Sequence, residues 1–287
     1  MVSQIPPEQA VHDIPVKTVS GLAIKTVMGN LPALMQMALF PFLLSALITA
    51  LSIQFIGNAT LSLLFALLSY IPHTLFAVAW HRRTLLNKEH LEPTSIISWN
   101  QNHTQFLFQV IILLAIYFSV DLFGNIPSTI LHSVSPPLGA ISSLILFIVT
   151  LYVIARVSFV LPASSVGEKY SIKDSWKHTE KQGWRLLGAF LLLFIPLSIA
   201  IFLIIGLIGG MFLPELILPP EANQTPELLS QLLTNYFDNN LEGILLLLII
   251  FLALSYIPTA AVISMLSIAF KGCTGWVPEQ SEEKINS

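Results

Sequence analysis

Six long apolar runs divide this chain, and they constrain its fold more than any other feature. Each run is long enough to cross a hydrocarbon core of ~30 Å as a helix that rises about 1.5 Å per residue. We predict spans at about 31–56, 60–82, 104–124, 138–161, 185–212 and 243–269. Backbone amides in hydrocarbon must be satisfied within their segment, and the runs do not alternate apolar and polar residues. The spans are therefore predicted as helices rather than barrel strands.

The cations fall in every second gap between these runs. All thirteen Lys and Arg residues lie in the N-terminal arm, after run two, between runs four and five, or in the C-terminal tail. Cytoplasmic loops retain Lys and Arg, so the pattern predicts that both termini are cytoplasmic. We expect a cytoplasmic N-terminal arm over 1–30, a six-helix transmembrane domain over 31–271 and a cytoplasmic tail over 272–287.

Composition excludes several classes of protein. Apolar residues make up 54% of the chain and charged residues 10%, whereas soluble domains contain roughly 25% charged residues. The predicted fold class is an all-α, polytopic transmembrane bundle with interfacial amphipathic helices. No concentrated basic surface suggests nucleic-acid binding. One cysteine, Cys273, excludes an intrachain disulfide, and the seven histidines are too scattered to predict a metal site.

The segment 171–182 is predicted as an amphipathic helix on the inner leaflet. Ser171 and Asp174 have capping-box spacing, and Gly183 ends the segment. Lysines repeat every four residues, which predicts a ridge on one helical face, and tryptophans flank it as headgroup anchors. Together with the basic end of run two, these side chains form the expected site for anionic lipid or a protein partner: Arg82, Arg83, Lys169, Lys173, Trp176, Lys177, Lys181, Trp184 and Arg185.

Short connections and two further amphipathic segments complete the predicted topology. External turns are expected at 56–60 and 124–139, so that the spans pair as three hairpins. Segments 93–105 and 225–237 also have amphipathic patterns. The first thirty residues lack an apolar segment followed by a small-residue cleavage site, so we expect the first span to direct insertion.

Polar side chains within the spans need a physical reason, because burying a charge in hydrocarbon costs at least ~2.5 kcal/mol. His73, near mid-membrane beside Tyr70, is either a proton carrier or ligand contact, or a neutral imidazole bonded to a neighbouring helix. Asp121 is predicted near the external end of run three as an interfacial carboxylate. Arg156 is predicted to snorkel to the inner surface or to pair with a carboxylate such as Glu168.

A possible internal repeat links runs two and six. Ser-Tyr-Ile-Pro occurs at 69–72 and again at 255–258, and Pro41 and Pro196 interrupt the preceding runs. Hairpins one–two and five–six would then be parallel copies, as in some transporters. The alternative is a chance match in a biased composition.

No metalloprotease, P-loop, serine-hydrolase elbow or Cys-x-x-Cys motif occurs in the sequence. We therefore favour a non-enzymatic multi-pass membrane protein, without a cofactor, that binds anionic lipid or a protein partner through 171–182. One alternative is a transporter or exporter of a small or lipid-like solute. A second is a membrane enzyme acting on lipid headgroups.

Two stretches, 80–86 and 155–193, carry a recognisable pattern. In the second, Arg-x-Ser and Leu-Pro-Ala close one helix, a loop with Glu follows, and Ser-Trp, Thr and Gly-x-Trp-Arg begin the next. The positions are Arg156, Ser158, Leu161, Pro162, Ala163, Glu168, Ser175, Trp176, Thr179, Gly183, Trp184 and Arg185. This pattern resembles YciC-like bacterial inner-membrane proteins and the membrane domain fused to some glycerophosphodiester phosphodiesterases. The resemblance implies a six-helix architecture in a bacterial inner membrane and carries over no catalytic residue.

Overall fold

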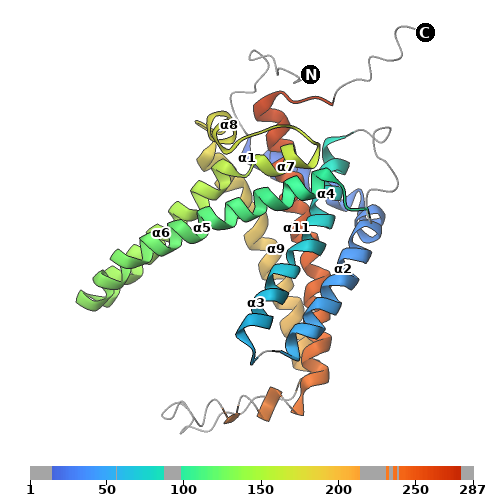
Figure 1. Ribbon diagram of the computed structural model, residues 1–287, viewed down its shortest axis with the longest axis vertical. Helices are drawn as coiled ribbons and strands as arrows, with labels where there is room; N and C mark the ends of the chain where they lie inside the picture. The colour runs from blue at the N-terminus through green and yellow to red at the C-terminus, as the bar shows by residue number, and fades with distance from the viewer. Residues whose placement is uncertain are drawn as a thin grey trace. The chain divides into compact units, whose positions relative to one another are not determined.

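The computed structural model of this chain describes residues 15–55, 57–86, 98–213, 231–232, 235–237 and 239–278, which form helices and no strand (Figure 1). Six helical segments are long and apolar enough to cross a membrane. The predicted all-α architecture with six candidate spans is therefore confirmed. The long helices are α2 (Leu31–Ile53), α3 (Ala59–Leu68) followed by α4 (Tyr70–Leu85), α5 (Gln101–Val134), α6 (Pro136–Val157), α9 (Gly183–Phe212) and α11 (Leu241–Thr274).

The chain divides into two compact units. Unit 1 comprises Met1–Leu193 together with Thr259–Ser287, and unit 2 comprises Phe194–Pro258. Within unit 2, α9 and α11 pack against each other, with the rings of Phe202 and Phe251 6.3 Å apart. The short helices α1 (Val16–Met28), α7 (Val160–Ser165) and α8 (Ile172–His178) belong to unit 1, and Figure 1 shows α7 and α8 at the same end of α6.

The N-terminal arm contains an amphipathic helix that the sequence reasoning missed. Helix α1 buries Val19, Ala23 and Val27 on one face at helical spacing. The hydroxyl of Ser20 donates a hydrogen bond to the carbonyl of Ala189, 3.3 Å away. Residues 16–28 are therefore part of the core of unit 1 and not a separate arm.

The turn predicted at 124–139 is wrong. Helix α5 continues to Val134 and α6 begins at Pro136, which leaves only Ser135 between them. Two glycines in this segment, Gly124 and Gly139, allow close helix packing. A Cβ on Gly124 would lie 2.1 Å from Leu146 Cδ1, and one on Gly139 would lie 2.6 Å from the Cα of His132. Small residues at helix interfaces have this role in membranes.

This longer hairpin also changes the predicted depth of Asp121. The carboxylate was expected near an end of run three, but α5 continues for 13 residues beyond it, or roughly 20 Å at about 1.5 Å per residue. Asp121 therefore lies in the interior of a long helix, half-buried. On the following turns of the hairpin, Ser128 Oγ lies 2.9 Å from Ser142 Oγ of α6, a polar contact between the two helices.

Other predicted connections are only partly described. Asn58 caps α3 by accepting a hydrogen bond from the Leu61 amide at 3.1 Å, within the turn predicted at 56–60. Of the segment 93–105, residues 98–100 are not helical and the rest of the described part begins α5. Most of the segment 225–237 lies outside the described residues.

Helices α4 and α11 meet through buried polar contacts within unit 1. The indole nitrogen of Trp80 donates to the Ala260 carbonyl at 3.0 Å and lies 2.9 Å from Ser264 Oγ. His81 Nδ1 lies 2.8 Å from Ser267 Oγ, whose hydroxyl donates to a carbonyl of its own helix. Nδ1 therefore carries the proton of this contact. Trp80, His81, Ser264 and Ser267 are all buried at this contact.

Two contacts between α4 and α11 have the same sequence spacing as the two Ser-Tyr-Ile-Pro motifs. His81 meets Ser267, and the ammonium of Lys271 lies 3.5 Å from the Leu85 carbonyl; both pairs are separated by 186 positions. The two Ser-Tyr-Ile-Pro motifs are separated by the same 186 positions. Helices related by a two-fold axis along their length meet at equivalent residues. Two of the α4–α11 contacts have this spacing, whereas Trp80 contacts Ala260 and Ser264 at spacings of 180 and 184 positions, so the internal repeat stays a prediction.

A disulfide cross-link tests this register. In a Cys273→Ser background, His81→Cys with Ser267→Cys should cross-link on mild oxidation, because their side chains already touch. Val78→Cys with Ser267→Cys is the matched control, since Val78 lies almost one helical turn away from His81 along α4. Equal cross-linking of both pairs, measured by gel mobility after proteolysis between the helices, would contradict the 186-residue register.

Candidate functional site

The candidate site is built where α8 docks on the junction of α6 and α7. The amide of Phe159, which lies between α6 and α7, donates to Ser175 Oγ at 3.2 Å. The hydroxyls of Ser175 and Thr179 donate to the Arg156 carbonyl at 2.8 and 3.0 Å. Both hydroxyl residues are fully buried. They therefore replace helical hydrogen bonds that the chain loses at the break after α6. The same contacts hold α8 against the junction of α6 and α7.

Arg156 is the central side chain of this junction. It is 8% exposed, its Nε donates to Thr179 Oγ1 at 3.3 Å, and Nη2 donates to the Trp176 carbonyl. Its guanidinium carbon lies 3.9 Å from the centroid of the Trp176 ring, a cation–π geometry. The predicted pairing with Glu168 is not observed. Glu168 instead accepts a hydrogen bond from the indole of Trp276 at 2.8 Å.

A glycine makes room for the arginine at the start of α9. A Cβ on Gly183 would lie 2.7 Å from Tyr152 Cε2 and 2.9 Å from Arg156 Cδ. The next residue, Trp184, contacts Tyr152 in a tilted ring pair with centroids 4.7 Å apart and remains 65% exposed. Gly183 therefore has a packing role at the first position of α9, and the prediction that it ends the helix of segment 171–182 is wrong, because α8 already ends at His178.

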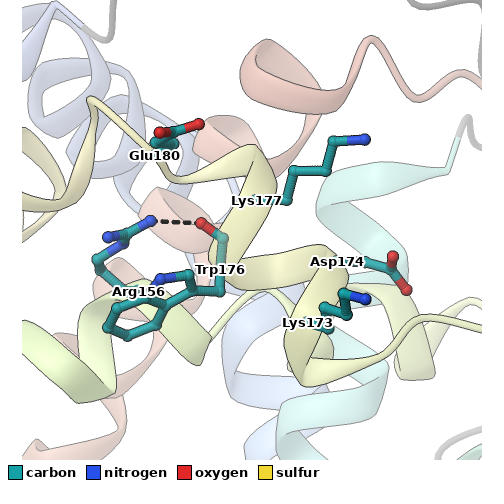
Figure 2. A pocket seen from close by; sticks show the side chains of 6 residues that line it. All are labelled: Arg156, Lys173, Asp174, Trp176, Lys177 and Glu180. Carbon is teal, nitrogen blue, oxygen red and sulfur yellow. Dashed lines mark hydrogen bonds between the residues drawn. The ribbon is translucent and has the colours of Figure 1, made fainter.

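An open pocket of about 610 Å³ lies over this junction (Figure 2). It is lined by three cations, two carboxylates and one indole: Arg156, Lys173, Lys177, Asp174, Glu180 and Trp176. A ligand pocket usually measures about 300–1,000 Å³, so a small polar group has room here. The pocket carries one more positive than negative group and therefore suits an anion.

The capping box predicted at the start of α8 is confirmed. Asp174 accepts from the Ser171 amide at 3.0 Å, and the Asp174 amide donates to Ser171 Oγ at 3.2 Å. The hydrogen bonds from Ser171 lower the pKa of the Asp174 carboxyl. Asp174 is therefore ionised at neutral pH, and its carboxylate is already bonded to the helix start. Nearby, burial raises the pKa of the Tyr170 hydroxyl, which lies 2.9 Å from His178 Nδ1.

The structure assembles only part of the predicted cationic set. Helix α8 spans only Ile172–His178, so the expected ridge of four lysines is wrong. Lys173 and Lys177 line the pocket one helical turn apart, together with Trp176 and with Arg156 from the intramembrane set. The remaining predicted residues of this region are outside the pocket lining: Lys169, Lys181, Trp184 and Arg185.

Arg82 and Arg83 form a separate group at the end of α4. Arg82 Nη1 donates to the Ser165 carbonyl at 3.4 Å, and Arg83 Nη2 donates to Asn30 Oδ1 at 3.0 Å. Asn102 Nδ2 also lies 3.4 Å from the Ser165 carbonyl. These contacts join α4 to the end of α7 and to the α1–α2 turn. The observed role of both arginines is therefore to connect helices.

His73 and Tyr70 are not part of the pocket. His73 Nδ1 lies 2.7 Å from the Ser69 carbonyl, so this contact is with the preceding turn and not with a neighbouring helix. Tyr70 is half-buried at the first position of α4. Among the described residues, no three His, Cys, Asp or Glu side chains come close enough to hold a metal ion.

Sequence reasoning did not assign a docking role to Ser175 and Thr179. Their spacing of four residues places both on the side of α8 opposite the exposed Lys173 and Lys177. Small hydroxyl residues at this spacing are typical of close helix contacts in membrane proteins. The spacing of Ser175 and Thr179 could therefore have predicted this helix contact from the sequence, but the lysine repeat in the same segment was interpreted instead.

The six apolar helices and the polar junction at the end of α6 define a multi-pass α-helical membrane protein. Comparison of the chain with models of known families, with curated protein sequences and with solved structures found no match.

Proposed function

We propose that this protein is a non-enzymatic membrane protein that binds the phosphate of a phospholipid headgroup in the α8 pocket. The observation that carries the proposal is the buried, stacked guanidinium of Arg156 beside Lys173 and Lys177. Its hydrogen bonds to Trp176 and Thr179 hold it in one orientation. A pre-oriented guanidinium beside two ammonium groups is a recurrent arrangement for binding phosphate.

The position of Arg156 along α6 favours a lipid as the source of that phosphate. Twenty residues separate Pro136 from Arg156, or ~30 Å of helix, which matches the thickness of a bilayer core. If Pro136 lies at one membrane surface, the guanidinium lies at the other, at headgroup depth. The exposed indole of Trp184 is a typical anchor for that depth.

The cation distribution supports a cytoplasmic placement for this surface and for both termini. The resemblance of 155–193 to YciC-like proteins supports a bacterial inner membrane. Headgroup binding in the α8 pocket depends neither on the cytoplasmic placement nor on the kind of membrane.

Lipid retention by paired lysine variants tests the proposal. Lys173→Gln with Lys177→Gln should lower the retention of phospholipid about thirtyfold, since each of the two surface cations contributes about 1 kcal/mol toward anionic headgroups. Native mass spectrometry of the protein released from detergent can count the lipids that remain bound.

The matched control is Lys169→Gln with Lys181→Gln. This pair removes the same charge from the same segment but lies outside the pocket. It should leave retention nearly unchanged. Equal losses in the two variants would indicate attraction by the whole segment, and no loss in either would contradict headgroup binding by α8.

A further inference from the structure

The carboxylates of the α8 pocket need an explanation that phosphate binding does not supply. A site for a purely anionic headgroup is weakened by acidic side chains on its wall, because like charges repel. Asp174 and Glu180 nevertheless line the pocket beside its three cations. In Figure 2 the two carboxylates lie at separate points of the rim, with Lys177 between them in this view.

The two carboxylates differ in the hydrogen bonds that they already accept. The Asp174 carboxylate accepts hydrogen bonds from the hydroxyl and the amide of Ser171, at 2.6 and 3.0 Å, and completes the cap of α8. Glu180 lies beyond the end of α8, exposed, and its carboxylate makes no hydrogen bond or ion pair with any described residue. This carboxylate is therefore the one that can accept hydrogen bonds from a bound cation.

The aromatic side chain of the pocket restricts which cation fits. A quaternary ammonium is usually held against aromatic faces, because it has no N–H to donate. Here the guanidinium of Arg156 already covers one face of the Trp176 ring, at 3.9 Å. A primary ammonium donates up to three hydrogen bonds and suits a carboxylate acceptor.

We infer that the α8 pocket selects an aminophospholipid, with the phosphate on Arg156, Lys173 and Lys177 and the primary ammonium on Glu180. This inference rests on the proposed headgroup function and names its ligand class. Phosphatidylethanolamine has this combination of groups. Phosphatidylglycerol lacks an amine. Phosphatidylcholine has a quaternary ammonium, which has no N–H and cannot donate a hydrogen bond.

Competition between lipids tests the inference. Purified protein is incubated in mixed micelles with equal amounts of phosphatidylethanolamine, phosphatidylglycerol and phosphatidylcholine, and retained lipid is measured by native mass spectrometry. We expect phosphatidylethanolamine to be retained about tenfold over phosphatidylcholine, which is the discrimination expected for one lost charge-assisted contact. Singly and doubly methylated phosphatidylethanolamine should fall between the two.

Glu180→Gln should remove this preference. The variant should retain phosphatidylethanolamine no better than phosphatidylcholine, while its retention of phosphatidylglycerol stays equal or rises. Lys181→Gln is the control, since it changes the next residue, which lies outside the pocket, and should keep the preference.

Wild-type protein that retains equal amounts of phosphatidylglycerol and phosphatidylethanolamine would overturn the aminophospholipid inference and leave headgroup binding intact. Retention of none of the lipids would overturn both.

Soluble glycerophosphoethanolamine separates a lipid from a free solute with the same groups. It should compete weakly, because it lacks the acyl chains that place the headgroup at this depth. If it binds while the intact lipid is not retained, the ligand is a soluble phosphoamine and the lipid assignment is wrong.

Discussion

Replacing Trp80 with alanine should lower the free energy of unfolding by about 2–4 kcal/mol, the largest loss expected from one substitution in unit 1. Trp80 is fully buried between α4 and α11, stacks on Phe76 with ring centroids 6.2 Å apart, and bonds to Ala260 and Ser264. Alanine would leave a cavity and would remove the indole partner of the Ser264 hydroxyl. Titration with a denaturing detergent, followed by helical circular dichroism, would measure the loss.

Two other tryptophan variants separate the causes of this loss. Trp80→Phe keeps most of the ring volume and removes the indole N–H, so it should cost about 1–2 kcal/mol. Trp184→Ala removes a ring that is 65% exposed and should cost much less than Trp80→Ala. A Trp80→Ala variant as stable as Trp184→Ala would show that the α4–α11 contact does not hold unit 1 together.

Gly183→Ala should be destabilising by about 1–3 kcal/mol and should also lower lipid retention. The new methyl group would lie within 3 Å of both Tyr152 and Arg156, in the middle of their side chains. Relief of this clash would move the guanidinium from its place over Trp176. The variant would therefore damage stability and the pocket together, which detergent unfolding and native mass spectrometry can measure on the same sample.

Gly188→Ala is the control for this substitution. Gly188 is also in α9, and a Cβ at this position would have Val16 Cγ1 as its nearest neighbour, at 3.9 Å, an ordinary contact. Alanine is better than glycine in a helix interior by about 1 kcal/mol, so this variant should be neutral or more stable. A loss of the same size in both variants would contradict the packing role assigned to Gly183.

The residue pattern between Arg156 and Arg185 has a structural meaning in this chain. Ser175 and Thr179 bond to the Arg156 carbonyl, Trp176 stacks on its guanidinium, and Gly183 provides the space beside it. Glu168 lies outside this cluster and holds Trp276. Five of the twelve pattern residues therefore meet in one packed junction, where packing and hydrogen bonding account for their residue types.

Predictions that depended on local chemistry were accurate. The Ser171 and Asp174 capping box requires only residues three positions apart, and the structure contains it. The prediction of a turn over 124–139 was wrong because α5 and α6 extend through this segment and pack closely against each other, a contact that appears only in the folded hairpin. Leu146 and His132 fill the space that the missing Cβ atoms leave at Gly124 and Gly139.

Hydropathy and length determined the helical class and the six candidate spans, because a run of apolar residues long enough to cross a bilayer has few other stable conformations in lipid. Tertiary structure alone decided which polar residues meet. Arg156 contacts Trp176 and Thr179, which are about 20 positions away in the sequence. Trp80 contacts Ser264 at a separation of 184 positions. Such pairs depend on how helices pack, and helix packing is set by the shapes of facing surfaces, which the order of residues along one helix does not reveal.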